Sequence, residues 1–168
     1  MIIRNPRPSD YSPIITVLDD WWGGRKVSLM LPKLFFEHFN NTSYIIEEDQ
    51  QIVAFLIGFL SQSRLDEAYI HFVGVNPNYR QRGYGRLLYE RFFVIARQNH
   101  RSVVRCVTAP INRTSIAFHT AMGFRIEPGA GELDGTAYDP DHDGPGENRV
   151  CFVRQSELGE NSSGKSID

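Results

Sequence analysis

The stretch from Val73 to Leu88 constrains the fold of this chain more than any other part of the sequence. It begins with Val-Gly-Val, passes through a turn containing Arg-Gln-Arg-Gly, and then takes up the apolar spacing of a helix. A helix start leaves backbone N–H groups unpaired, and glycine lets the backbone approach a bound group closely. The stretch is therefore suited to binding phosphate, and we expect Arg80, Arg82 and Arg86 to add positive charge there.

Two widespread phosphate-binding motifs do not fit these residues. A dinucleotide-binding fingerprint needs a third glycine at the position of Leu88, and a Walker loop needs Gly-Lys followed by Ser or Thr, which this stretch lacks. Both motifs therefore fail on residue identity.

Hydrophobic periodicity around this stretch predicts an α+β fold with a mixed, mostly antiparallel sheet. The 168 residues are enough for one domain. We expect that domain to cover residues 1–155 and residues 156–168 to be a disordered tail without apolar clusters. The predicted strands are residues 2–3, 44–47, 52–60, 67–75, 102–108, 124–127 and 149–155; the predicted helices run from Ser9 or Asp10 towards Trp21, over 31–39, over 84–98 and from about 110 to 123, with a loop at 128–148.

Charge is segregated along the chain, although the net charge is only −2. Residues 76–126 carry 9 basic and 1 acidic side chains, whereas residues 127–168 carry 3 basic and 10 acidic ones. An acidic third would repel a long phosphate backbone, so the basic middle fits a compact anion better than nucleic acid. We expect no nucleic-acid partner.

The two cysteines, Cys106 and Cys151, each lie in an apolar, strand-like run. This placement favours free thiols over a disulfide framework and indicates a reducing compartment, so we expect a cytoplasmic protein. The longest apolar run, Ile52 to Leu60, is too short to cross a bilayer, and we expect no membrane association.

Two blocks of sequence resemble the GNAT superfamily of N-acetyltransferases. The residues Arg-Gln-Arg-Gly-Tyr-Gly at 80–85 look like the family signature Arg/Gln-x-x-Gly-x-Gly/Ala. The run from Asn112 to Phe124, Asn-Arg-Thr-Ser-Ile-Ala-Phe-His-Thr-Ala-Met-Gly-Phe, resembles the later family helix, Asn-x-x-Ala-x-x-(apolar)-Tyr-x-x-x-Gly-Phe. The blocks occur in the family's order, with predicted strands where the family has them.

The resemblance implies a GNAT-like sheet flanked by helices in three layers, whose splayed strands 67–75 and 102–108 bind acetyl-CoA as co-substrate. It also implies that the backbone of Val73, Gly74 and Val75 pairs with the pantetheine arm, and that Asn112 contacts CoA. The pyrophosphate would be held by residues 80–86, namely Arg80, Gln81, Arg82, Gly83, Tyr84, Gly85 and Arg86. A glycine inside a strand, such as Gly74, marks a bulge or a close backbone approach, or simply a place of tight packing.

The second block departs from the family pattern at two positions. Ser115 replaces the usual Ala, and His119 replaces the Tyr that protonates the departing CoA thiolate in the family. An imidazolium is a competent acid near its pKa of about 6.5, and His119 shares a helix face with Asn112 and Ser115. The sequence leaves two readings open: His119 is the acid, or it packs beside CoA.

A general base is sought on the strand of residues 67–75. Strand alternation predicts that Glu67, Tyr69, His71 and Val73 share one face. Several family members draw their base from this strand at positions that match Tyr69 or His71. We therefore take His71 as the first candidate and Glu67, acting through water, as the second; a buried structural histidine is the alternative for His71.

The acidic loop from Glu132 to Glu147 contains Asp-Pro-Asp-His-Asp-Gly at 139–144, which imitates the start of an EF-hand. Its twelfth position is Val150 rather than Glu, and Pro145 interrupts it, so we expect no metal. The loop either draws in a cationic acceptor or is a solvated connector. By resemblance, the aromatic residues near the acceptor would be Trp21, Trp22, Phe35 and Phe36, of which at least two should be core.

We predict an acetyl-CoA-dependent N-acetyltransferase that moves acetyl to a primary amine by direct attack. The alternative is a non-catalytic acyl-CoA-binding sensor that kept the phosphate site and lost the Tyr acid. The acceptor, a small-molecule or peptide amine, cannot be narrowed further from the sequence. It also leaves open whether the chain acts alone or as a homodimer.

Overall fold

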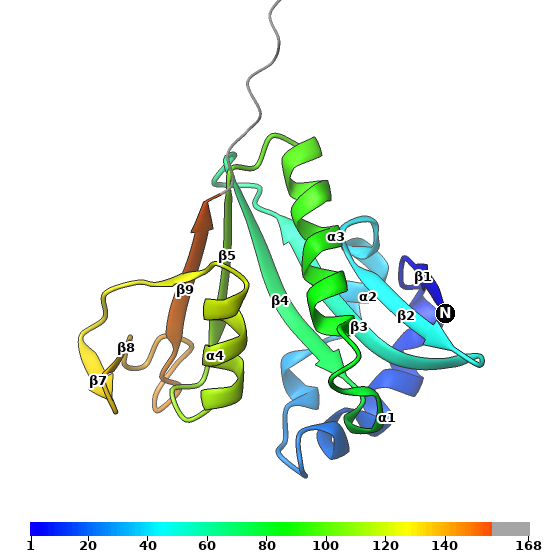
Figure 1. The fold of residues 1–168 in the computed structure, drawn as a ribbon, viewed down its shortest axis with the longest axis horizontal. Helices are drawn as coiled ribbons and strands as arrows, with labels where there is room; N and C mark the ends of the chain where they lie inside the picture. Colours follow the sequence, from blue (N-terminus) through cyan, green and yellow to red (C-terminus); the bar gives the residue numbers. More distant parts are fainter. Residues whose placement is uncertain (156–168) are drawn as a thin grey trace, which may run out of the picture.

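The computed structural model describes residues 1–155, which form one seven-stranded sheet with helices on both faces (Figure 1). The strands are β1 (Ile2–Arg4), β2 (Tyr44–Glu48), β3 (Gln51–Leu60), β4 (Glu67–Val75), β5 (Val103–Thr108), β6 (Arg125–Ile126) and β9 (Val150–Gln155), with a separate hairpin of β7 (Gly131–Leu133) and β8 (Thr136–Tyr138). The helices are α1 (Tyr11–Trp21), α2 (Leu34–His38), α3 (Tyr84–Gln98) and α4 (Arg113–Ala121), and short 3-10 turns occupy residues 8–10, 28–30, 40–42 and 77–79.

The sheet order is β1-β2-β3-β4-β5-β9-β6, and every neighbouring pair is antiparallel except β4 and β5. This confirms the predicted mixed, mostly antiparallel α+β fold. The parallel pair is short: it runs only from Glu67 opposite Val103 to Tyr69 opposite Arg105. Figure 1 shows the two strands meeting at one end and diverging towards the end where α3 begins. The predicted splay between these strands is present.

Two hydrophobic cores cover the two faces of the sheet. On one face α1 and α2 pack through Ile14, Leu18 and Phe36, among others. On the other face α3 packs through Leu88 and Phe92. Helix α4 lies on the same face as α3 (Figure 1). A group that passes through the β4–β5 opening would therefore connect the two faces.

Strand β4 contains a β-bulge that the alternation pattern did not reveal. Ile57 of β3 pairs with Phe72, whereas the next residue, Gly58, pairs with Ile70. His71 is therefore the extra residue, left without a partner on β3. A bulge reverses the facing of the residues that follow it, and it is a common device next to active sites.

The bulge makes one expectation about β4 wrong. Glu67, Tyr69 and His71 were expected to share a face with Val73, but Val73 packs on the α3 side of the sheet. His71 stacks on Phe35 of α2 on the other side, with 4.3 Å between ring centroids. His71 and the segment predicted to pair with pantetheine therefore lie on opposite faces of the sheet.

Helix α2 is shorter than the predicted helix over residues 31–39. It spans only Leu34–His38, and Ser28–Met30 forms a separate 3-10 turn. The cause is Pro32, because the residue before a proline is pushed out of the helical region. Leu31 has φ −124° and ψ 72°, well outside that region.

The stretch 128–148, predicted as a loop, contains the β7–β8 hairpin. Its two-residue turn is Asp134-Gly135, and both residues have positive φ, 50° and 78°. Asp-Gly between short extended segments is a strong hairpin signal, so the sequence did carry the information.

The expected disordered tail, residues 156–168, lies outside the described residues. Among the helices of residues 1–155, none has both the length and the apolar character that crossing a bilayer requires.

Candidate active site

The turn before α3 has the backbone of an anion site. Gly83 is the N-cap with φ +80°, Gln81 is also left-handed at φ +64°, and the first helical hydrogen bond runs from the Leu87 N–H to the Gly83 carbonyl. The N–H groups of residues 84–86 therefore have no carbonyl within the helix to bind. A Cβ placed on Gly83 would meet no atom within 4 Å, so the space above this glycine is open. These features suit a phosphate at the start of a 15-residue helix.

The three arginines of the turn have different roles. Arg80 donates from Nη2 to the Trp21 carbonyl at 2.7 Å, which ties the turn to the end of α1. Arg82 lies over the Tyr79 ring and pairs with Glu48 at 3.3 Å, yet its side chain stays 53% exposed. Arg86 is exposed. Arg86 can turn towards a phosphate, and the half-exposed Arg82 can do so by leaving Glu48, whereas Arg80 shapes the turn.

Tyr84 and Gly85 serve packing. The Tyr84 ring is buried and its hydroxyl donates to Glu48. A Cβ on Gly85 would lie 3.3 Å from Phe118, so this glycine lets α3 approach α4. Only their backbone N–H groups are placed to meet an anion.

The segment Val73–Val75 borders the opening between β4 and β5. Pairing with β5 ends at Tyr69, so the edge of β4 that faces β5 is unpaired beyond that residue. This edge is available to hydrogen-bond an extended ligand. A Cβ on Gly74 would lie 2.5 Å from the Phe55 ring, which gives this glycine a packing role as well.

Helix α4 begins with Asn112 as its N-cap, whose Oδ1 accepts from the Ser115 N–H at 3.2 Å. The side chain of Asn112 therefore stabilises the helix start. Ser115 Oγ lies 3.2 Å from Nδ1 of His119, one turn further along. The three residues share a helix face as predicted.

His119 is a buried, neutral histidine. Its side chain lies in the core, stacked on Phe152 with 4.7 Å between centroids. Nδ1 lies 2.7 Å from the Ser115 carbonyl, which can only accept, so Nδ1 carries the proton. Nε2 therefore accepts from the Tyr89 hydroxyl at 2.7 Å. Burial lowers the pKa of His119 below its ordinary value. Of the two interpretations left open by the sequence, this geometry favours a packing role over the acid role.

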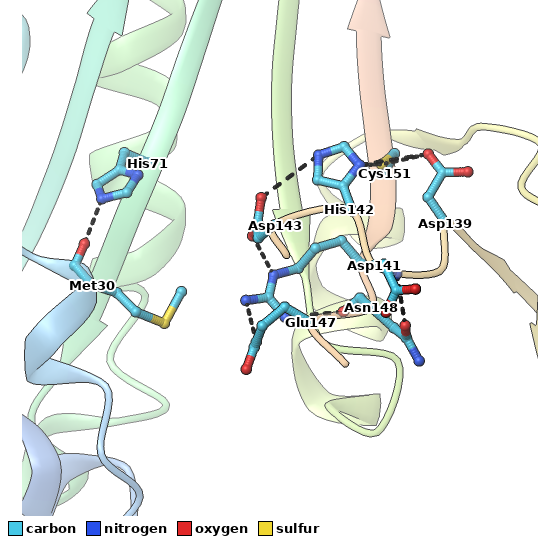
Figure 2. A network of polar contacts seen from close by, with 10 residues as sticks. Met30, His71, Asp139, Asp141, His142, Asp143, Glu147, Asn148 and Cys151 are labelled. Atoms are coloured by element: carbon cyan, nitrogen blue, oxygen red, sulfur yellow. Dashed lines mark hydrogen bonds and ion pairs between the residues drawn. The ribbon is translucent and has the colours of Figure 1, made fainter. Parts of the chain in front are cut away.

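His71 is held in one tautomer by a backbone carbonyl of the 3-10 turn at residues 28–30. Its Nε2 lies 2.7 Å from the Met30 carbonyl, so Nε2 carries the proton and Nδ1 keeps a lone pair (Figure 2). Burial lowers the pKa of His71, although the Met30 carbonyl and the charge of Asp143 act in the opposite direction. A neutral imidazole with an unused basic nitrogen is what a general base requires.

A cavity of about 380 Å³ lies on the same face of the sheet as His71, where β4, β5 and β9 meet. Glu67 lines it and pairs with Arg105 Nε at 3.0 Å, and Arg105 also pairs with Glu127 at 2.6 Å. Tyr69 is a further wall, and burial raises the pKa of its phenol. Glu67 is thus already engaged in an ion pair, whereas Nδ1 of His71 has no hydrogen-bond or ion-pair partner among residues 1–155.

Three residues of the cavity wall were not selected from the sequence: Asp139, His142 and Cys151. The Cys151 thiol donates to Asp139 Oδ2 at 3.4 Å and lies 3.6 Å from His142 Nδ1 (Figure 2). Burial, this hydrogen bond and nearby carboxylates raise the pKa of Cys151 to about 12. The signal in the sequence was the short spacing between the Asp and His residues at 139–143 and Cys151, a half-buried cysteine in a strand.

The aromatic residues divide as expected between core and site. Trp21 and Phe36 are buried. Trp22 packs on Phe72, and Phe35 stacks on His71. Of the four, only Phe35 directly supports a candidate catalytic side chain.

Comparison with known proteins agrees with this architecture. A model of the acetyltransferase (GNAT) family matches residues 11–124. A search of curated proteins found no match.

Several solved structures share the fold. Ard1 from Thermoplasma volcanium has a TM-score of 0.74 at 20% identity, covering 92% of this chain and 96% of that one. Naa20 from Chaetomium thermophilum, solved with a bisubstrate analogue, has 0.70 at 21%, covering 94% and 88%. The protein yncA from Salmonella typhimurium, solved with acetyl-CoA, has a TM-score of 0.67 at 20% identity, covering 99% of both chains. The family match spans about two-thirds of the 168 residues. The chain therefore belongs to the GNAT family of acetyltransferases.

Proposed function

We propose that this protein transfers an acetyl group from acetyl-CoA to a primary amine by direct attack of the amine on the thioester. One observation carries the proposal: the open helix start of α3 stands at the end of β4 that has diverged from β5, and the same strand presents His71 on the opposite face. A donor bound on one side could thus meet an acceptor on the other through the opening.

The donor site would use mainly backbone groups. The unpaired edge of Val73–Val75 would hold the pantetheine arm, and the N–H groups of residues 84–86 would hold the pyrophosphate. Arg82 and Arg86 would add charge. The fold relative yncA, solved with acetyl-CoA, supports this choice of co-substrate.

His71 would serve as the general base. Its Nε2–H is anchored on the Met30 carbonyl, so the lone pair of Nδ1 is the site that would take the amine's proton. Because the pKa of His71 is lowered, this nitrogen stays unprotonated at neutral pH. Glu67 would contribute negative charge to the cavity rather than accept the proton, since it pairs with Arg105.

The departing thiolate would take its proton from water. Both ring nitrogens of His119 are engaged, one with Ser115 and one with Tyr89, so no imidazole proton is left for the sulfur. We assign His119 to holding α4 against α3 instead of to proton delivery.

The acceptor would be a cationic amine in its resting form. Glu67, Glu127 and Asp139 line the cavity, and their negative charge would attract the amine. Arg64 and Arg105 neutralise part of that charge. Both cysteines are free thiols, which supports our proposal of a cytoplasmic site of action.

The alternative of an acyl-CoA sensor rests on one observation, the engagement of His119 in the core. Release of CoA thiol from acetyl-CoA, measured across amines, amino acids, aminoglycosides, polyamines and peptides, separates the two. We expect saturable, amine-dependent release with at least one class. Acetyl-CoA binding without amine-dependent release across the whole panel would support the sensor.

A further inference from the structure

Three donor atoms of different chemistry form a small triangle on the cavity wall. Cys151 Sγ lies 3.4 Å from Asp139 Oδ2 and 3.6 Å from His142 Nδ1, and the latter two atoms are 3.6 Å apart. All three atoms lie within 4.8 Å of one another, and no other set of three or more such residues meets this criterion within residues 1–155. Figure 2 shows the three side chains converging from β9 and the loop before it.

These separations match the edges of a tetrahedral zinc site. Zinc bonds of about 2.3 Å to sulfur, 2.0–2.1 Å to nitrogen and 2.0–2.2 Å to oxygen place neighbouring donors about 3.3–3.6 Å apart at tetrahedral angles. We propose that Asp139, His142 and Cys151 bind one Zn²⁺ ion, with the fourth position open to water or to a ligand in the cavity.

The chemistry of the three ligand atoms favours zinc over calcium. A thiolate and an imidazole are ligands that zinc accepts and calcium does not favour, since calcium takes six to eight oxygens. From the sequence we rejected a calcium site at residues 139–144 and expected no metal; the proposal instead places two zinc ligands, Asp139 and His142, in that stretch. The third ligand, Cys151, comes from the neighbouring strand β9, and its contact with His142 is seen only in the three-dimensional structure.

A carboxylate lies near the far side of the histidine ligand. Its other ring nitrogen, Nε2, lies 3.9 Å from Asp143 Oδ1, and the buried Arg149 fixes Asp143 through an Nε–Oδ2 contact of 2.6 Å. A metal-bound histidine usually donates a hydrogen bond from its distal nitrogen to a carboxylate, and Asp143 would have to move closer than 3.9 Å to accept one.

The loop itself is built to hold this shape. Asp139 and Arg149 form a β-bridge with backbone hydrogen bonds of 2.8 and 3.0 Å. Between them, Asp141 Oδ1 accepts from the Gly146 N–H at 2.6 Å, and Asn148 accepts from the Asp141 N–H at 2.9 Å. The ligands at 139, 142 and 151 are thus positioned before any ion arrives.

A catalytic cysteine is the competing reading of the same cluster. Asp139, Asp143 and Glu127 surround Cys151 with negative charge, which opposes a free thiolate nucleophile. A divalent cation reverses this, because it turns the same charges into a favourable environment. Metal binding would release the thiol proton to solvent as the Zn–S bond forms.

The proposal goes beyond acetyl transfer and does not depend on it, so it is tested on purified protein without acetyl-CoA. The protein is stripped with a chelator and titrated with Zn²⁺ by calorimetry and with Co²⁺ by absorbance. We expect one ion per chain, a thiolate-to-cobalt charge-transfer band and the strong visible bands of four-coordinate cobalt. Zinc should also raise the unfolding temperature.

Variants assign the ligands. Cys151→Ser should abolish the charge-transfer band, and Asp139→Asn and His142→Gln should each weaken zinc binding at least about 10- to 100-fold, the loss that even outer-layer partners cause. Matched controls are Cys106→Ala, the other free thiol, and His100→Gln, an exposed histidine. Both should bind zinc like the parent. Circular dichroism checks that each variant is folded.

Two outcomes would overturn the proposal. One is the absence of stoichiometric binding in the folded parent. The other is zinc binding that survives Cys151→Ser and Asp139→Asn unchanged, which would indicate adventitious surface binding. Covalent labelling of Cys151 by acetyl-CoA, with no metal bound, would instead favour the nucleophile reading.

Discussion

At the scale of single residues, Gly83 carries the phosphate assignment. It sits at φ +80° with open space above it, so a side chain there costs strain, about 1–2 kcal/mol, without any clash inside the protein. We expect Gly83→Val to project into the phosphate position and lower CoA affinity more than tenfold, measured by calorimetry.

Gly135 provides a matched control for that variant. It has nearly the same conformation, φ +78°, and equally open surroundings, but lies in the β7–β8 turn. Gly135→Val should cost similar stability and leave CoA affinity unchanged. Equal CoA affinities for the two variants would contradict a phosphate site at the start of α3.

Substitutions at His119 and Tyr89 test whether His119 acts as the acid in place of the family's tyrosine. His119→Phe leaves the buried Tyr89 hydroxyl without its acceptor, which should cost about 1–3 kcal/mol in the free energy of unfolding. We expect kcat to stay within about tenfold of the parent, with the alkaline limb of its pH profile intact. Urea denaturation and steady-state kinetics measure the two effects.

Adding Tyr89→Phe to that variant removes the orphaned hydroxyl and should restore part of the stability. If His119→Phe instead lowers kcat by about 10² to 10⁴ and abolishes the alkaline limb, His119 is the acid after all.

His71 gives the corresponding test for the base. In His71→Gln the amide nitrogen can still donate to the Met30 carbonyl, but the basic nitrogen is gone. We expect kcat to fall by about 10² to 10⁴ with little change in the KM for acetyl-CoA. The parent's acidic limb should lie below about pH 6.5, because burial lowers the pKa of His71.

Glu67→Gln serves as the comparison for His71→Gln, because Glu67 is the second candidate and is engaged with Arg105. Its effect on kcat should be much the smaller of the two. The reverse order would make Glu67 the base.

At the scale of elements, Gly74 lies where β3 and β4 pack closely. A substitution there tests whether this glycine serves the packing of the strands or the binding of CoA. A Cβ there would lie 2.5 Å from Phe55, so Gly74→Ala should cost about 1–3 kcal/mol through overpacking. Trimming the ring with Phe55→Leu should recover part of the loss in thermal unfolding. A loss of CoA affinity that this second change does not relieve would mean that Gly74 serves the ligand.

Elements with a strong local signal could be predicted from the sequence, and those set by distant partners could not. Helix α3 and its glycine turn follow from residues 80–98 alone. The short α2 follows from Pro32, and the β7–β8 hairpin from Asp134-Gly135, so these were readable but misjudged. The bulge at His71 depends on the register between β3 and β4, which no local pattern encodes.

The candidate site divides along the same line. The phosphate turn is contiguous in sequence, and its backbone features were predictable. The cavity is assembled from β4, β5, β9 and the loop at 139–149, so the meeting of His142 with Cys151 required the three-dimensional structure. The burial of His119 likewise depends on Tyr89, 30 residues away.

At the scale of the whole molecule, two neutral histidines predict how stability varies with pH. Burial lowers the folded-state pKa values of His71 and His119 below the ordinary 6.5 of the unfolded chain. Below that value the unfolded state binds more protons, so the free energy of unfolding falls as pH decreases and is level above it. Urea denaturation between about pH 7.5 and pH 5 should show this decline, since the carboxylates titrate lower.

Replacing one of the two histidines provides the control for that measurement. His119→Phe should flatten part of the slope, because one of the two titrating groups is gone. A stability that is constant from about pH 7.5 to pH 5 would contradict neutral, buried histidines.

The central claim is that this GNAT protein catalyses acetyl transfer to an amine, and the most direct test is a count of product molecules. Acetyl-CoA and the amine that gives the fastest thiol release are incubated with trace protein, and the acetylated amine is quantified by mass spectrometry. We predict many acetylated molecules per protein molecule, and far fewer with His71→Gln. A yield that never exceeds one acetylated amine per protein molecule would contradict catalysis and leave a protein that only binds acyl-CoA.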